Sequence, residues 1–288
     1  MIFSKISLAP GVYVTATPLG NARDITLRAL DVLASADILV SEDTRVLRKL
    51  MQIHGIPIGN RPLCALHDHS RGATVEHLIN AVGQGKSVAL TSDAGTPLIS
   101  DPGYELVCAA HAHEILVTSA PGPSAVITAL SIAGVPTDHF AFMGFLPSKS
   151  AQRESVLQDV KMHPHPIAFY ESAKRLLASL GQIETICGPH RRVAICRELT
   201  KKFEDVQNAP VTKLIEHFTH APAKGEIVII LCPDHQAKLD EQTVDQALVN
   251  ALLTHRVKDA TVLVAGAFNL PKRDVYQRAL ELSRKDPT

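Results

Sequence analysis

The sequence lacks an overall charge of either sign. Its 288 residues include 29 basic and 29 acidic side chains, so the formal net charge is +0. A balanced chain gives no global electrostatic argument for binding nucleic acid, which requires a basic surface. The balance breaks down locally, because residues 149–202 contain 10 basic and 5 acidic residues. This excess predicts either a zone that contacts phosphates or an ordinary solvated helix face.

Paired cysteines and long apolar runs are also missing. The five cysteines are scattered, their number is odd, and no Cys-x-x-Cys pair occurs. This usage argues against a disulfide scaffold and favours a reduced, intracellular protein. The N-terminus has no secretory signal pattern, and no apolar stretch is long enough to span a bilayer. We therefore expect a cytoplasmic protein with no membrane partner.

Two phosphate-binding signatures and a metal signature are absent as well. No Gly-x-Gly-x-x-Gly follows the first predicted strand, and no complete P-loop of the form Gly-x-x-x-x-Gly-Lys-Ser/Thr occurs, which disfavours a Rossmann dinucleotide site and an NTPase. His67, Asp68 and His69 could supply two metal ligands, but no third or fourth ligand is evident. We therefore expect no metal.

What the chain does contain is an alternation of β-rich runs and helical patterns up to residue 232. Strands are predicted at 12–16, 38–41, 87–91, 115–119, 167–170, 193–196 and 227–232. Helices are predicted between them at 25–34, 73–82, 104–111, 149–161, 174–186 and 211–219. Such alternation is typical of an α/β protein with a mostly parallel sheet.

A Pro-Gly-Pro sequence at 121–123 marks a boundary between two α/β domains, since it blocks both helix and strand pairing. We predict domains at 1–120 and 121–235, and a helical segment at 236–288 with helices at 244–253, 258–267 and 271–284. Asn269 is placed to cap the last of these helices. The last two helices resemble a helix-turn-helix, with Lys272 and Arg273 opening the second one. A helical cap or dimer contact is the competing interpretation.

Four loops of small residues follow or flank predicted strands, at 17–21, 41–45, 92–97 and 121–125. The most informative is 92–97 (SDAGTP), with 101–103 (DPG) just behind it and a helix after that. Loops that follow parallel strands converge at one edge of the sheet, where ligands bind. The set therefore predicts a ligand site between the domains.

The order of short motifs identifies a resemblance. These motifs are TPLGN (17–21), EDTR (42–45), SDAGTP (92–97), DPG (101–103), PGPSA (121–125), GFLP (144–147), YES (170–172), RELTK (197–201) and KGE (224–226). Together they resemble the ribosomal RNA small subunit methyltransferase I family, in the tetrapyrrole-methylase-like class of S-adenosylmethionine (SAM) methyltransferases. The resemblance runs from about residue 12 to 232.

The resemblance implies two α/β domains with SAM in the cleft between them, and a homodimer. It implies methyl transfer to the ribose 2′-oxygen of a cytidine in the decoding region of 16S rRNA, in the small ribosomal subunit. Matching loops imply cofactor contacts at Pro18, Leu19, Gly20, Asp93, Ala94, Gly95, Ser124, Ala125, Phe145 and Gly225.

The remaining candidate roles come from the chemistry of the reaction. A ribose hydroxyl is a poor nucleophile and needs a base, for which Glu42, Asp43 and Asp93 are candidates. Alternatively, Asp93 binds cofactor or caps a helix, and the other two carboxylates pair with Arg45. The candidates for substrate binding are Arg45, Glu171, Arg175, Arg197 and Lys201, because arginine matches phosphate geometry. A plain salt-bridge cluster is the alternative.

Two other functions remain open at this stage. One is SAM-dependent methylation of a tetrapyrrole or another small molecule. The other is a non-catalytic RNA-binding assembly factor that holds SAM. The basic bias of residues 149–202 favours RNA, and the complete set of loops favours catalysis.

Overall fold

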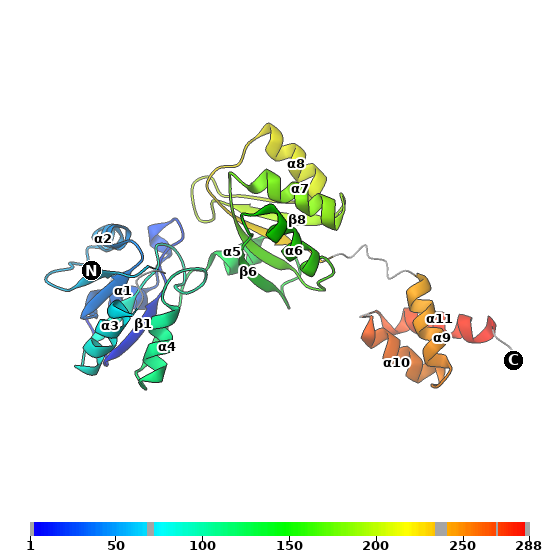
Figure 1. Cartoon of the computed structure of the whole chain (residues 1–288), viewed down its shortest axis with the longest axis horizontal. Helices are drawn as coiled ribbons and strands as arrows, with labels where there is room; N and C mark the ends of the chain where they lie inside the picture. The colour runs from blue at the N-terminus through cyan, green and yellow to red at the C-terminus, as the bar shows by residue number, and fades with distance from the viewer. Residues whose placement is uncertain (1–2, 68–71, 234–240, 269, 286–288) are drawn as a thin grey trace. The chain divides into compact units, whose positions relative to one another are not determined.

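A computed structural model describes residues 3–67, 72–233, 241–268 and 270–285 (Figure 1). The chain divides into two compact units, Met1–Pro233 and Asp234–Thr288. The Pro-Gly-Pro sequence at 121–123 lies inside the first unit, between two separate five-stranded sheets. None of the helices in the described residues combines the length and the apolar character needed to cross a membrane.

The first sheet is entirely parallel and has the order β3-β2-β4-β1-β5. Its strands are β1 (Gly11–Thr15), β2 (Ile38–Ser41), β3 (Leu63–Ala65), β4 (Ser87–Leu90) and β5 (Val117–Ala120). Because all five strands run the same way, their carboxyl ends share one edge of the sheet. Strand β5 begins two residues after the start of the strand predicted at 115–119. Strand β3 was not predicted, because it has only three residues.

Helices cover both faces of this sheet, because its strands place apolar side chains on both. The helices are α1 (Leu27–Ser35), α2 (Thr44–Ile53), α3 (Ala73–Gly83) and α4 (Tyr104–Ala112). Tyr13 and Leu39 point to one face, where they pack with residues of α1 and α2. Val12 and Val40 point to the other face and pack with residues of α3 and α4. Successive side chains alternate between faces, so each strand contributes to both cores.

The second sheet is mixed, with the order β6-β7-β10-β8-β9, in which only β6 and β7 are parallel. Its strands are β6 (Ala141–Phe145), β7 (Ile167–Ser172), β8 (Arg192–Arg197), β9 (Asp205–Pro210) and β10 (Glu226–Leu231). The expectation of a mostly parallel sheet therefore holds for the first sheet only. Short connections such as that between β8 and β9 join antiparallel neighbours without a crossover helix.

The second sheet also has helices on both faces. One face carries the larger core, which includes the fully buried Phe169 and residues of α6 (Ser150–Val160), α7 (Leu176–Cys187) and α8 (Val211–His220). The other face is covered by α5 (Ala125–Ile132), whose Val126, Ala129 and Leu130 pack on it. The chain leaves the first sheet at β5 and enters α5 directly, so the 121–125 loop joins the two sheets, which are called the first and second domain here together with their helices.

The Asp234–Thr288 unit is a small three-helix bundle of α9 (Glu241–Leu252), α10 (Val257–Ala267) and α11 (Lys272–Lys285). Leu248, Val264 and Ala279 are buried in its own core. Arg278, one of the basic residues of the last helix, donates to both carboxylate oxygens of Asp245 on α9. This arginine therefore ties the bundle together. The cap predicted at Asn269 lies outside the described residues.

Candidate functional site

Backbone and side-chain hydrogen bonds join the predicted loops at the carboxyl edge of the first sheet. The 92–97 loop is their centre. Thr17 and Gly95 exchange two backbone hydrogen bonds of 2.8 and 3.0 Å, which tie it to the first loop. Asp93 Oδ1 accepts from the backbone N–H of Asp43, at 2.9 Å, which ties it to the second. The Thr96 hydroxyl donates to the Pro123 carbonyl, also at 2.9 Å, which ties it to the fourth. The predicted convergence of the four loops is thus confirmed.

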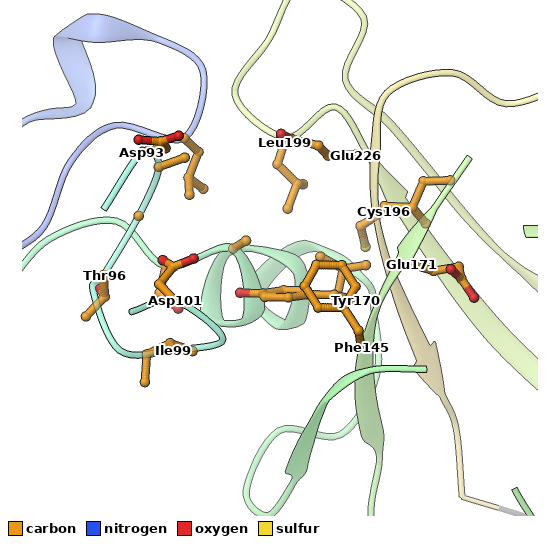
Figure 2. A pocket seen from close by; sticks show the side chains of 17 residues that line it. Asp93, Thr96, Ile99, Asp101, Phe145, Tyr170, Glu171, Cys196, Leu199 and Glu226 are labelled. Carbon is orange, nitrogen blue, oxygen red and sulfur yellow. The ribbon is translucent and has the colours of Figure 1, made fainter. Parts of the chain in front are cut away.

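A pocket of about 240 Å³ opens between these loops and the second sheet (Figure 2). The first domain contributes small and acidic residues together with Leu19 and Ile99 to its walls. The second contributes side chains of α5, β6, β7 and β10 and of the chain at the end of β8. The lining residues are Leu19, Asp93, Ala94, Gly95, Thr96, Ile99, Asp101, Ser124, Ala125, Phe145, Tyr170, Glu171, Cys196, Leu199, Glu226, Ile227 and Val228.

Most of the predicted cofactor residues lie in this lining, and several other candidates lie outside it. Leu19, Asp93, Ala94, Gly95, Ser124, Ala125 and Phe145 line the pocket, as does Glu171. Pro18, Gly20, Glu42, Asp43, Arg45, Arg175, Arg197, Lys201 and Gly225 are not among the lining residues. The sequence therefore predicted most of the wall that the first domain contributes (the first wall) and less of the wall that the second domain contributes (the second wall).

Backbone conformation shapes the first wall. Gly95 has a φ of +83°, a left-handed conformation that favours glycine, and a Cβ at this position would lie 3.1 Å from Cδ2 of Leu19. Leu98 and Ser100 are also left-handed, with φ of 71° and 66°, although neither is glycine. Such residues cost about 1–3 kcal/mol each and concentrate at ligand sites. They flank Ile99, which lines the pocket.

Aromatic rings and an acid face each other across the pocket. The Tyr170 ring contacts Phe142 in a tilted arrangement and Phe145 edge-on, with ring centroids 4.8 and 5.3 Å away. Its hydroxyl points toward the carboxylate of Asp101 (Figure 2). Burial, and next the charge of Asp101, raise the pKa of Tyr170 to about 12. The phenol therefore stays protonated at neutral pH and is a hydrogen-bond donor in the pocket.

Asp43 is paired with its neighbour Arg45. Arg45 donates to both carboxylate oxygens, and the Arg45 backbone N–H donates to Oδ1 at 2.8 Å. These bonds from Arg45 lower the pKa of Asp43 to about 2. Asp43 is also the N-cap of α2. The pairing of Asp43 with Arg45 is therefore present, while any role as a base stays a prediction.

Glu171 and Arg175 form a pair within the second domain. The buried Glu171 carboxylate accepts from Ser172 N at 2.7 Å, Ser179 Oγ at 2.5 Å and Arg175 Nη2 at 2.6 Å. Arg175 Nη1 also donates to the Leu146 carbonyl, at 3.1 Å. In Figure 2 the Glu171 side chain points away from the centre of the pocket. The pair therefore joins β6, β7 and α7 to one another.

Lys201 belongs to a separate cluster at the other side of the pocket. Its Nζ lies 2.8 Å from Glu198 Oε1 and 2.9 Å from Glu226 Oε2. Hydrogen bonding by Lys201 lowers the pKa of Glu198. Gly20 packs against this lysine, since a Cβ there would lie 2.3 Å from Lys201 Cγ. The cluster thus joins the second domain to the first loop.

Five of the ten basic residues in 149–202 are buried or lie beside a carboxylate. Arg153 and Arg191 are buried, at 6% and 5% exposure. Arg197 lies 3.9 Å from Asp205, while Arg175 and Lys201 bind the carboxylates named above. Arg175, Arg197 and Lys201, the candidates for substrate binding, therefore lie beside different carboxylates and do not form one salt-bridge cluster.

Three pocket residues, Asp101, Tyr170 and Glu226, lie in motifs of the resemblance but were not predicted as site residues. Asp101 lies in the DPG turn, Tyr170 lies within β7, and Glu226 is the first residue of β10. Val228 on β10 is paired with Tyr170 on β7. Only antiparallel pairing brings the start of one strand beside the end of another. Because the sequence was interpreted as forming a mostly parallel sheet, it could not predict this wall.

The chemistry of the lining fits SAM. Asp93, Asp101 and Glu226 place carboxylates around the pocket, and no lysine or arginine is among the described lining residues. This composition suits a ligand with a sulfonium and an ammonium group and disfavours a pyrophosphate. Leu19, Val228 and the aromatic rings provide an apolar surface for an adenine. No three His, Cys, Asp or Glu side chains in the described part of the chain gather to hold a metal, and Asp68 and His69 lie outside that part.

Comparisons with known proteins agree with this geometry. A family model described as Tetrapyrrole (Corrin/Porphyrin) Methylases matches residues 11–215, and one described as RsmI C-terminal HTH domain matches residues 238–283. A ribosomal RNA small subunit methyltransferase I from Mesorhizobium japonicum is 45% identical, over 96% of this chain and 93% of the relative. One from Escherichia coli O157:H7 is 42% identical, over 94% of both chains.

Solved structures share the fold at lower identity. The methyltransferase CobJ superposes with a TM-score of 0.59 at 19% identity, over 78% of this chain and 94% of CobJ. Diphthine synthase gives a TM-score of 0.57 at 13% identity, over 77% and 89%. S-adenosylmethionine is the cofactor of this class of methylases, in agreement with the acidic and aromatic lining. The chain belongs to the ribosomal RNA small subunit methyltransferase I family, within the tetrapyrrole methylases.

Proposed function

We propose that this protein transfers the methyl group of SAM to the ribose 2′-oxygen of a cytidine in the decoding region of 16S rRNA. The observation that carries the proposal is near-full-length identity of 45% and 42% to relatives named for small-subunit rRNA methylation. The match of residues 238–283 to the family's C-terminal helix-turn-helix model supports the same substrate.

The cofactor would be held by loops of both domains. We propose contacts from Leu19, Asp93 and the Ala94-Gly95 backbone on one side, and from Ser124, Ala125 and Phe145 on the other. Their place in the pocket lining supports these roles. Pro18, Gly20 and Gly225 would act from behind the lining. Gly225 leaves room for Glu198, because a Cβ there would lie 2.1 Å from Glu198 Oε1.

Bound SAM supplies a methyl group on a sulfonium, whose C–S bond breaks as the new C–O bond forms. The protein has to align the ribose with that methyl group and accept the hydroxyl proton. Alignment contributes on the order of 7–11 kcal/mol to such reactions. A carboxylate base contributes typically about 10²–10⁴-fold in rate.

Among the acids proposed as bases, Asp93 has the best support, because it lines the pocket. Its Oδ1 is anchored by Asp43 N, which fixes where the carboxylate points. We add Asp101, which also lines the pocket, opposite Tyr170. Glu42 and Asp43 remain candidates with a positioning role, at the loop that Asp93 holds.

Substrate contacts are proposed for Arg45, Arg197 and Lys201, and for the Glu171–Arg175 pair as their support. Arg45 is the most accessible of them, with 89% of its side chain exposed. We also propose a homodimer in the cytoplasm. Exposed apolar residues on α5 and the edge strand β6, such as Ile127 (52%) and Met143 (49%), would suit contact with a second copy.

The test is transfer of labelled methyl groups from SAM to three acceptors offered separately. These are small ribosomal subunits from a strain without the homologous enzyme, protein-free rRNA, and a porphyrinogen precursor. We expect label in rRNA, with the alanine variant of Asp93 losing transfer. Label in the porphyrinogen alone would contradict the proposal. Wild-type rates for the Asp93, Asp101, Asp43 and Glu42 alanine variants would refute the assignment of the base.

A small-molecule acceptor is the second candidate function, favoured by the fold neighbours. One of them is a uroporphyrin-III-C-methyltransferase from Thermus thermophilus, with a TM-score of 0.52 at 19% identity. Such low identity supports a common fold and not a common substrate. The porphyrinogen assay distinguishes the two functions.

A further inference from the structure

Helix α2 lies along the edge of the first sheet where the loops meet. Its first turn is anchored beside the pocket, because Asp43, its N-cap, donates its backbone N–H to Asp93. Its last residue is followed by His54, whose Nε2 lies 2.9 Å from the carbonyl oxygen of Ala22. Ala22 follows the first loop, also at this edge. Both ends of the helix are therefore fixed to cofactor loops.

One face of α2 is buried and the other is basic. Leu47 and Met51 pack into the core, while Arg48 and Lys49 are exposed. The helix itself, TRVLRKLMQI, contains no acidic residue. With 10 residues at about 1.5 Å rise, it is roughly 15 Å long. Arg48 and Lys49 thus form a narrow cationic strip beside the pocket.

The charge of this strip is not cancelled by nearby carboxylates. Arg45 is paired with Asp43 and is therefore not counted in the strip. Arg48, Lys49 and Arg23 form no ion pair with any carboxylate in the described residues. Arg23 is exposed and directly follows Ala22, the residue that His54 contacts. Among the ten basic residues of 149–202, by contrast, Arg153 and Arg191 are buried, and Arg175, Arg197 and Lys201 lie beside carboxylates.

We infer that Arg48 and Lys49 of α2, with Arg23, form a docking surface for the phosphodiester backbone of the substrate RNA. This inference rests on the proposed function, and it assigns the RNA path to the first domain beside the cofactor. The exposed cations fit a polyanion, and the position of α2 allows a nucleotide in the pocket to continue along the strip. Backbone phosphates give affinity and register without reading sequence.

The experiment compares two variants that each remove two positive charges. The test variant is Arg48→Ala with Lys49→Ala. The control is Lys86→Ala with Lys213→Ala, since Lys86 precedes β4 at the opposite edge of the sheet and Lys213 lies on α8. Affinity for protein-free small-subunit rRNA and for small subunits is measured across a salt series, and affinity for SAM is measured in parallel.

We expect the test variant to bind rRNA about three- to tenfold more weakly and to bind SAM as wild type does. Its salt dependence should fall by about 1.4 in slope, at about 0.7 for each lost phosphate contact. Affinity and slope equal to those of the control would overturn the inference. Weaker binding to subunits without weaker binding to rRNA would also overturn it, because the partner would then be a ribosomal protein.

Single variants Arg48→Gln and Lys49→Gln guard against a folding defect, and each should give about half of the slope change. The inference and the proposed function fail differently. If wild-type protein transfers no methyl group to rRNA, the proposed function fails. If transfer occurs and the α2 variants bind rRNA normally, only the docking surface is wrong.

Discussion

The buried carboxylate of Glu171 gives the sharpest stability prediction. In Glu171→Gln the side chain keeps its shape, but Arg175 loses its anionic partner and Ser179 its charged acceptor. Breaking a buried ion pair costs about 3–5 kcal/mol. Because 27% of the Arg175 side chain stays exposed to water, we expect about 2–3 kcal/mol. For a unit of this size, that corresponds to a fall of about 5–10 °C in Tm.

The assay is thermal unfolding followed by far-UV circular dichroism, with RNA affinity measured on the same samples. The control is Glu184→Gln on α7, whose carboxylate accepts a hydrogen bond from the hydroxyl of the exposed Thr212. We expect less than about 0.5 kcal/mol there. An unchanged Tm for Glu171→Gln together with weaker RNA binding would refute the structural role and favour direct substrate contact.

Three further predictions concern Asp43, Tyr170 and Gly225. The depressed pKa of Asp43, about 2 against an ordinary 3.8, means its contribution to stability is complete above pH 3.8 and lost as the pH falls through 2; the Tm difference between wild type and Asp43→Asn should shrink over that range, and a constant difference would contradict the pairing. The pKa of Tyr170 is about 12 against an ordinary 10, so in an ultraviolet titration its phenol should ionise at a higher pH than an exposed tyrosine. Tyr170→Phe should remove this high-pH step, and a titration that the variant leaves unchanged would refute the burial argument. Gly225→Ala, at φ +84° and against Glu198, should cost about 1–2 kcal/mol and weaken SAM binding, whereas Gly188→Ala, also at positive φ but in open space, should lower Tm alone; equal SAM affinity in the two would show that Gly225 does not support the pocket.

The parts predicted well from the sequence are those that local patterns determine. Buried strands such as β4 and amphipathic helices such as α3 can be predicted from the spacing of their apolar residues. Parallel strands then force loops 17–21 and 92–97 to one edge, so the first wall of the pocket follows from topology. The resemblance of the motifs extends this to the cofactor.

The parts that were not predicted depend on tertiary context. Strand β9 (DVQNAP) is a half-buried edge strand without apolar alternation, and β6 contains Gly144 at φ +66° and a shift in register. Helix α2 buries only Leu47 and Met51, too few for a clear period. The ion pairs of Arg175 and Lys201 could not be told from substrate contacts, because charge alone does not reveal burial.

The central claim, methylation of a ribose oxygen, is tested most directly by alkaline hydrolysis of rRNA labelled by this protein from SAM. Alkali cleaves RNA through the free 2′-hydroxyl, so a 2′-O-methyl group protects the adjacent phosphodiester bond. The account predicts label in a dinucleotide that begins with cytidine. Label recovered in mononucleotides would place the methyl group on a base and contradict the account.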